Sequence, residues 1–254
     1  MSEISSLPSA APTIDAITEA LAPWRSPLSR ALHRNRAQPF ARYLQLATVR
    51  PDGTPANRTI VFRGFLANTN RLMFICDRRS EKTHHTHQNP AAEACWYFTK
   101  TREQFRLSGQ LTLITAETAG TECDRVELGT TEPDGANKTQ ENTDSKKAQL
   151  DQRALLAAGQ QARHTVWQNI SANAKIQFAW PHPKEPRAEA AAFAPSAPDE
   201  QTPPPTFCLL LLTVHQVDHL ALRGEPQNRT LYQLAQEPMT ALQAEPWETI
   251  SVNP

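Results

Sequence analysis

Short alternating segments joined by tight turns constrain the fold of this chain more than any other feature. The segment 103–114, EQFRLSGQLTLI, alternates polar and apolar residues almost without interruption. Residues 41–49, 56–66 and 71–77 are also strand-like, and the turn sequences RPDGTP and ANTN separate them. Alternation of this kind indicates strands with one dry face, and Asp-Gly and Asn-rich links favour hairpins. The pattern predicts an antiparallel meander.

The rest of the chain adds more strands and a few helices. Residues 93–98, 207–222, 229–234 and the closing 247–254 are further strand-like segments. Helical spacing predicts two short helices within 14–35, one from Ser80 to Asn89, and one over 150–170. Because strands do not alternate with helices, we expect a mainly β fold, a small closed antiparallel barrel with peripheral helices. Closure would also remove exposed strand edges.

Composition divides the chain into one domain with poorly structured additions. We expect a flexible N-terminal arm at 1–13 and a single domain over 14–254. Two low-complexity insertions interrupt it, at about 116–149 and 181–206, where apolar residues are scarce or proline and alanine dominate. The first insertion has room for a short helix at 121–128.

Charge and apolar content exclude several classes of partner. Lys plus Arg and Asp plus Glu number 26 each, so no overall field attracts nucleic acid or an anionic membrane. The longest apolar run, 207–214, is far shorter than the ~20 residues that cross a bilayer. Four widely spaced cysteines and an N-terminus without a signal pattern predict reduced thiols in a cytoplasmic protein.

The stretch CDRRSEKTHHTHQNP, residues 76–90, is open to three interpretations. His84 and His87 share a helix face, but they lack a third ligand and adjoin basic residues, so we expect no metal site. A helix that begins near Ser80 directs unpaired N–H groups at its start, and Arg79 and Lys82 add positive charge there. This chemistry suits a phosphate monoester, although a basic helix start is also common on solvated surfaces.

Two other segments carry candidate binding residues. In NRTIVFRG, Arg58 and Arg63 flank a dry, β-prone run that suits a ligand with one charged end and a flat apolar part. Ordinary solvated arginines on an edge strand are the alternative. Gln104, on the polar face of the alternating strand, can donate and accept hydrogen bonds to a heterocycle.

Together the segments RTIVFRG, RLMFICDRRSEK, WYF…REQFR and NRTLYQ resemble the pyridoxamine 5′-phosphate oxidase-like flavoproteins. The resemblance covers 20–115 and 160–180 well and 207–254 more loosely, and it excludes the two insertions. It implies an FMN-binding split barrel of six or seven antiparallel strands that assembles as a homodimer. The cofactor-binding residues that it implies are Arg58, Thr59, Ile60, Val61, Phe62, Arg63, Ile75, Cys76, Arg79, Ser80, Glu81, Lys82, Gln104 and Arg229.

The resemblance also assigns roles within this set. Residues 79–82 would hold the FMN phosphate, with Glu81 departing from the basic residue that the oxidases carry. Ile75 and Cys76 would contact the cofactor largely through backbone, Gln104 would meet the flavin ring, and Arg229 would reach the cofactor across a dimer interface. Arg63 aligns with the lysine that holds the substrate phosphate and is our candidate contact for a substrate anion.

Other departures concern the substrate rather than the cofactor. Glu225 and Gln227 occupy the positions where the oxidases carry an arginine and a histidine, and Leu220 stands where a tryptophan is expected. We therefore expect an FMN-dependent oxidoreductase that transfers hydride to or from a small molecule. Its substrate is either pyridoxamine or pyridoxine phosphate or another compound, and no residue is assigned as catalytic. The alternatives are a non-catalytic FMN-binding or storage module and a split barrel with haem, another cofactor or none.

Overall fold

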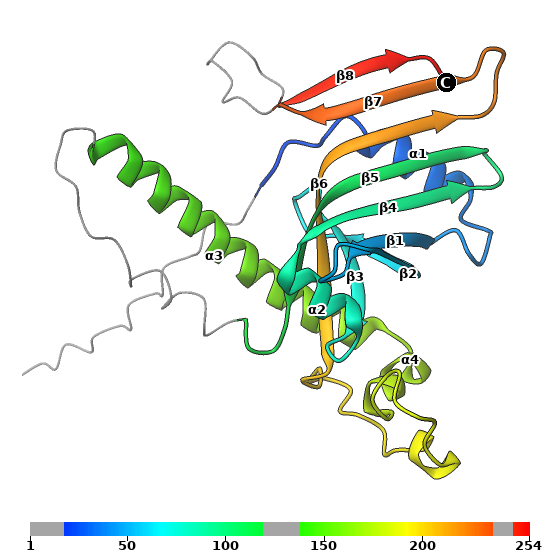
Figure 1. Ribbon diagram of the computed structural model, residues 1–254, viewed down its shortest axis with the longest axis vertical. Helices are drawn as coiled ribbons and strands as arrows, with labels where there is room; N and C mark the ends of the chain where they lie inside the picture. Colours follow the sequence, from blue (N-terminus) through cyan, green and yellow to red (C-terminus); the bar gives the residue numbers. More distant parts are fainter. Residues whose placement is uncertain (1–17, 119–137, 236–245) are drawn as a thin grey trace, which may run out of the picture.

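The computed structural model describes residues 18–118, 138–235 and 246–254 of the 254-residue chain. Strands dominate it, and most of them follow one another in antiparallel succession (Figure 1). The strands are β1 Tyr43–Val49, β2 Pro55–Phe65, β3 Leu72–Asp77, β4 Ala91–Phe98, β5 Glu103–Ile114, β6 Phe207–Ala221, β7 Asn228–Leu234 and β8 Trp247–Val252. The helices are α1 Arg25–Arg34, α2 Glu81–Gln88, α3 Lys138–Asn169 and α4 Ala172–Ile176, with 3-10 turns η1 Gln177–Ala179 and η2 Ala190–Phe193.

The sheet closes on itself through its two outermost barrel strands. Its order is β3-β2-β1-β4-β5-β6-β7-β8, and β3 also pairs with β6 from Leu72↔Leu212 to Asp77↔Phe207. Six strands therefore form a closed antiparallel barrel, and β7 and β8 extend the sheet beyond β6. The predicted fold class, a mainly β antiparallel split barrel with peripheral helices, is confirmed.

The barrel interior is filled by the residues that alternate inward along its strands. On β5 the buried positions include Phe105, Leu107 and Leu111, as the sequence pattern predicts. Trp96 is fully buried among Phe62 and Phe98, with ring centroids 5.0 Å away in each case. Burial of large aromatic side chains is a major source of stability in a core of this size.

Helix α3 packs against the outside of the barrel. On α3, Leu155 and Leu156 pack on a cluster that includes Ile114, Leu209 and Leu211. Near the C-terminal end of α3, the ring of Trp167 lies 5.0 Å from that of Phe207. The N-terminal end of α3 extends away from the barrel (Figure 1). The strand β6 is consequently apolar on both faces along its first half, which explains the uninterrupted run FCLLLLTV.

The helices differ from prediction in two places within the described residues. One helix, α1, replaces the two expected within 14–35, because Pro27 lies in its first turn, where no intrahelical N–H bond is lost. Residues 14–17 and the proposed helix at 121–128 lie outside the described residues. The helix α3 begins at Lys138, inside the segment 116–149 that the sequence predicts to be an insertion without a core.

The second predicted insertion, 181–206, is held against the fold at several points. Trp167 Nε1 donates to Asp199 O at 2.9 Å, and Lys175 Nζ donates to Glu200 O at 3.2 Å. Apart from η2 the segment forms no helix or strand, yet these contacts fix its course beneath α3 and α4. Proline-rich composition predicts the irregular backbone correctly but not its anchoring.

Candidate functional site: a basic cavity at the start of helix α2

A sharp corner joins strand β3 to helix α2. The strand ends at Asp77, and Ser80 is the residue before the helix, with an extended backbone at ψ 148°. The Ser80 hydroxyl donates to Asp77 O at 2.7 Å and makes no capping hydrogen bond with the helix. The first N–H groups of a helix have no acceptor within it. This corner therefore offers backbone donors to an anion.

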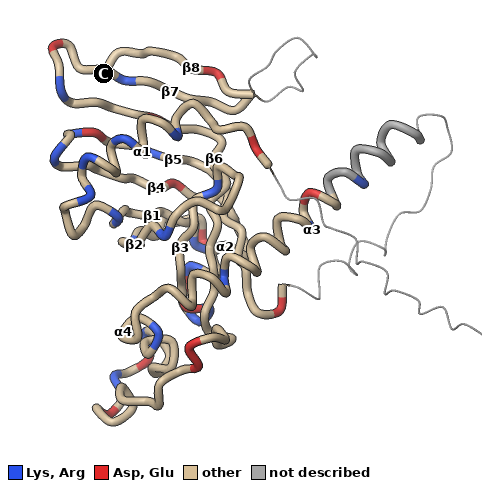
Figure 2. Tube along the Cα trace, turned by 180° about the vertical axis from the view of Figure 1, so that it is seen from behind, with Lys and Arg blue, Asp and Glu red and all other residues tan. Residues whose placement is uncertain are grey.

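A cavity of about 730 Å³ opens beside this corner. Three parts of the chain enclose it: the corner with α2, the beginning of β2 with the turn before it, and the segment that follows η1. Figure 2 marks basic positions around α2 and along the chain beyond α4. The lining residues are Arg50, Ala56, Asn57, Arg58, Arg78, Arg79, Ser80, Glu81, Lys82, Thr83, His84, His85, His182, Pro183 and Lys184.

Basic side chains outnumber acidic ones in this lining by six to one. Three of the six cations are already paired with carboxylates of the chain. These pairs are Arg78 with Glu117, Arg79 with Asp77 and Lys184 with Glu81. Within the described residues, Arg50, Arg58 and Lys82 have no carboxylate within 4.0 Å. The cavity thus holds three positive charges that its own ion pairs do not cancel.

Arg58 is fixed at the barrel end by neutral oxygen acceptors. Its Nη1 donates to Leu46 O and Ala56 O at 3.0 Å each and to Thr48 Oγ1 at 2.7 Å. Burial lowers the pKa of Arg58 from its ordinary value, although a guanidinium remains charged at neutral pH. The side chain is therefore rigid and cationic before any ligand binds, which suits it to hold an anion.

His85 completes this network from helix α2. Its Nδ1 lies 3.0 Å from Thr48 Oγ1, and only 4% of the residue is exposed. Since Thr48 Oγ1 accepts from Arg58, its proton is available to His85 Nδ1, which favours the neutral ring. Burial first, and then the charge of Arg58, lowers the pKa of His85. The sequence predicted only that the histidines of this stretch hold no metal; His84 and His85 line the cavity.

Five of the predicted cofactor residues line the cavity, and each has a defined partner. Lys82 Nζ donates to Ser80 Oγ at 2.9 Å, while Glu81 is paired with Lys184. Arg79 is committed inside the chain, with Nη2 at 2.6 Å from Asp77 Oδ2 and Nη1 at 2.9 Å from Trp180 O. The five are Arg58, Arg79, Ser80, Glu81 and Lys82.

The other predicted residues divide between the core and the outer surface of the barrel. Ile60, Phe62 and Cys76 are buried in the barrel core, and Ile75 packs between the barrel and α3. Their side chains are taken up by packing, so only their backbone is available to a ligand. Thr59, Val61 and Arg63 alternate to the opposite face of β2, and Gln104 is half-buried on β5, opposite Tyr97 of β4.

Arg63 carries an unsatisfied donor on this outer face. Its Nε is buried and has no hydrogen-bond partner within the described part of the chain. Burial also lowers the pKa of Arg63, and the neighbouring Arg42 lowers it further. A buried donor of this kind is costly unless something accepts from it.

Arg229 lies away from the cavity, on β7 opposite Leu220 of β6. It is paired with Asp218 of its own chain, as is Arg106. The hydrogen bond from Arg229, followed by that from Arg106, holds the pKa of the Asp218 carboxyl below its usual range. Within the described chain Arg229 is therefore ion-paired with Asp218, and it does not line the cavity with the other predicted cofactor residues.

Sequence reasoning missed the cavity residues that are distant in the chain. Arg50 comes from the β1–β2 turn, and His182 and Lys184 come from a segment interpreted as an insertion; Arg78, which lies within the corner, was also missed. The RPDGTP turn offered a weak signal, since its hairpin pairs Val49 with Pro55 and so sets Arg50 near the start of β2, the strand that carries Arg58. Within the described residues no group of three or more His, Cys, Asp or Glu side chains could hold a metal ion.

Comparison with known proteins places residues 21–115 in a defined family model. The segment matches the model described as pyridoxamine 5′-phosphate oxidase, FMN-binding domain. The chain is also 31% identical over 204 residues to pyridoxine/pyridoxamine 5′-phosphate oxidase 2 of Arabidopsis thaliana, covering 80% of this chain and 85% of the relative.

Two solved structures resemble the whole architecture. A pyridoxamine 5′-phosphate oxidase-related, FMN-binding protein from Nostoc punctiforme PCC 73102 is 46% identical with a TM-score of 0.71, covering 93% of this chain and all of the other. PhzG from Burkholderia lata 383, in complex with tetrahydrophenazine-1-carboxylic acid, is 17% identical with a TM-score of 0.59, covering 93% and 99%. The second likeness concerns the fold alone.

Proposed function

Because the chain belongs to the pyridoxamine 5′-phosphate oxidase family, whose matched domain binds FMN, we propose that it is an FMN-dependent oxidoreductase of a small molecule. The resemblance and the cofactor inferred from sequence are thereby confirmed at the level of the family. Bound FMN would supply hydride-transfer chemistry, while the chain supplies binding, orientation and charge.

The positive charge of the cavity is the main support for placing the phosphate group of FMN there. A phosphomonoester bears about −1.5 to −2 at pH 7, and Arg50, Arg58 and Lys82 are three cations without a carboxylate partner in the described chain. The N–H groups at the start of α2 and the Ser80 hydroxyl lie at the same corner. We place the FMN phosphate here, where the positive charge of the three cations exceeds its negative charge.

The flavin ring is proposed to lie on the outer face of the barrel. There β2 presents Val61 beside Tyr43 of β1, and β4 presents Tyr97 beside Gln104 of β5. Tyr43 is 49% exposed and Tyr97 is 44% exposed, which is unusual for large aromatic residues. Gln104 would orient the ring through its amide, which both donates and accepts.

The same face supports assembly as a homodimer. Exposed Tyr43 and Tyr97 offer an apolar surface that a second copy would cover. Arg229 could then contact the partner's cofactor, since it lies on the neighbouring part of the sheet. A homodimer would place both flavin rings at the interface and shield them from water.

Arg63 is proposed to hold the anionic group of the substrate. Its buried Nε, without a partner in the described chain, provides the donor. Glu225 and Gln227 do not suit a phosphate, because one is a carboxylate and the other is neutral. The substrate is therefore a small anion that one arginine can hold, and pyridoxamine phosphate is one compound to test.

We also propose a cytoplasmic location. Cys76 and Cys208 lie opposite each other across β3 and β6 as free thiols, which suits a reducing compartment. The described residues contain no helix with the length and hydropathy that a membrane span requires.

Purified protein should take up FMN and show an oxidised flavin spectrum. NADH, NADPH and pyridoxamine phosphate should then be added separately under anaerobic conditions. At least one of them should reduce the bound flavin and bleach its spectrum, at a rate fast enough for catalytic turnover. Release of hydrogen peroxide with pyridoxamine phosphate would identify the oxidase activity specifically. Bound FMN that no donor reduces would contradict the oxidoreductase and favour a storage module.

A further inference from the structure

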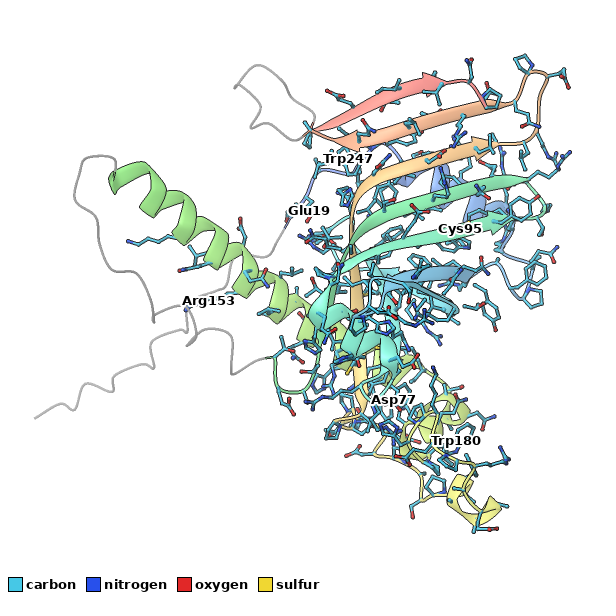
Figure 3. All side chains as sticks on the ribbon, viewed as in Figure 1. Glu19, Asp77, Cys95, Arg153, Trp180 and Trp247 are labelled. Carbon is cyan, nitrogen blue, oxygen red and sulfur yellow. The ribbon has the colours of Figure 1, made fainter. Side chains whose placement is uncertain are left out.

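A short segment after η1 contributes to the lining of the phosphate cavity; we call residues 180–184 the strap. Its first residue is tied to the corner, because Trp180 O accepts from Arg79 Nη1 at 2.9 Å. Figure 3 shows Trp180 on the segment below Asp77, whose carboxylate holds the same arginine. His182, Pro183 and Lys184 line the cavity. The strap is thus a wall of the phosphate site.

The strap brings a lysine to the only carboxylate that lines the cavity within the described chain. Glu81 is the first residue of α2, and its carboxylate is ion-paired with Lys184 Nζ. This contact lowers the pKa of Glu81, so the carboxyl is ionised at neutral pH. Unpaired, a negative charge at this position would repel a phosphate at the same corner.

The ion pair itself adds little to stability. The Lys184 side chain is 69% exposed and that of Glu81 is 47% exposed, and exposed pairs contribute little to folding. Lys184 nevertheless has a backbone φ of 70°, a left-handed conformation that side-chain-bearing residues rarely adopt. Because folding gains little from the pair, its main effect is electrostatic: it offsets the negative charge of Glu81 in the cavity lining.

We propose that Lys184 is a positioning residue of the phosphate site, acting by cancelling the charge of Glu81. The strap thereby keeps the three cations Arg50, Arg58 and Lys82 free to meet a dianionic phosphomonoester. Lys184 consequently sets the preference of the protein for FMN over riboflavin, which has the same ring and no phosphate. This inference rests on the proposed position of the phosphate and adds a residue from outside the family-matched segment.

The test compares affinities for FMN and riboflavin, measured by quenching of flavin fluorescence. Lys184→Gln should weaken FMN roughly 10-fold, from the repulsion of an unpaired carboxylate, and leave riboflavin unchanged. Lys184→Arg should restore FMN affinity because it keeps the charge. The double variant Glu81→Gln, Lys184→Gln should also return to within about 3-fold of the parent, because both charges are gone.

Lys100→Gln is the matched control, since Lys100 is an exposed lysine in the β4–β5 turn and does not line the cavity. It should bind both flavins as the parent does. Unchanged FMN affinity in Lys184→Gln, equal losses for both flavins, or no recovery in the double variant would each overturn the role of Lys184. A parent protein that binds FMN no better than riboflavin would instead overturn the phosphate site and this inference together.

Discussion

Arg229 donates two hydrogen bonds to Asp218 of the same chain, from Nε to Oδ1 at 3.0 Å and from Nη2 to Oδ2 at 2.7 Å. Arg106 contacts the same carboxylate from β5. Asp218 is only 7% exposed, so this carboxylate fixes two guanidinium groups on the sheet before any partner binds. The arrangement leaves one net positive charge beside the proposed ring site.

Asp218→Asn should destabilise the fold by about 1 kcal/mol, because charge-assisted hydrogen bonds to two arginines are lost. The folded-state pKa of Asp218 is depressed, so its contribution is present above the unfolded pKa near ~3.9 and is lost as pH falls through the folded value. Urea denaturation of parent and variant at neutral pH and at pH ~3 checks this. The difference between them should shrink in acid, and a constant difference would refute it.

Lys82→Ala should weaken FMN binding by about 1.5–3 kcal/mol, the contribution of one charge-assisted contact. Its Nζ now reaches only Ser80 Oγ among the hydrogen bonds of the described chain, so little folding stability depends on it. Isothermal titration with FMN measures the effect, and Lys82→Arg should recover part of it. An unchanged affinity in Lys82→Ala would mean that the phosphate lies elsewhere.

His85 should make the protein sensitive to mild acid. Burial and the charges of Arg58, Arg50 and His84 lower its folded-state pKa, opposed by Glu81. The unfolded chain then binds a proton first, so stability is present above the unfolded pKa of ~6.5 and is lost as pH falls below it. His85→Gln should lose less stability than the parent between pH ~7 and ~5 in urea titrations. An equal loss in both proteins would contradict this origin.

Tyr97→Glu should convert the proposed dimer to a monomer. The side chain is 44% exposed on the proposed contact face, and a carboxylate there would be buried without a partner. Sedimentation velocity of parent and variant measures the change, and weakened FMN binding should accompany it. Glu248→Gln, an exposed change on β8, serves as the control. A parent that sediments as a monomer with full FMN affinity would exclude the dimer.

Local pattern predicted most of the strands because each has its own turn signals. Residues 103–114 form β5, and Asp77 and Ser80 bound the corner as expected. The pattern failed at the start of α3 and in the segment 181–206. The start of α3 at Lys138 lies in a segment with no apolar face of its own, and the anchoring of 181–206 depends on Trp167 and Lys175, far away in sequence.

The site residues that were predicted from sequence lie close together in the chain, and most of those that were missed lie far apart. Arg79, Ser80 and Lys82 share one turn, so their joint chemistry is visible in a few letters. Arg50 precedes this turn in the sequence by about 30 residues and Lys184 follows it by about 100, and only the folded structure brings them to the same cavity. Sequence also cannot show that Arg79 is committed to Asp77, because such a pairing depends on side-chain geometry.

The most direct test of the account is a crystal structure of the protein grown with FMN. We expect the phosphate at the start of α2, within hydrogen-bond distance of Lys82 Nζ and the Ser80 hydroxyl, and in the cavity that Arg50 and Arg58 line. A phosphate bound at any other place, or crystals that take up no FMN at saturating concentration, would contradict it.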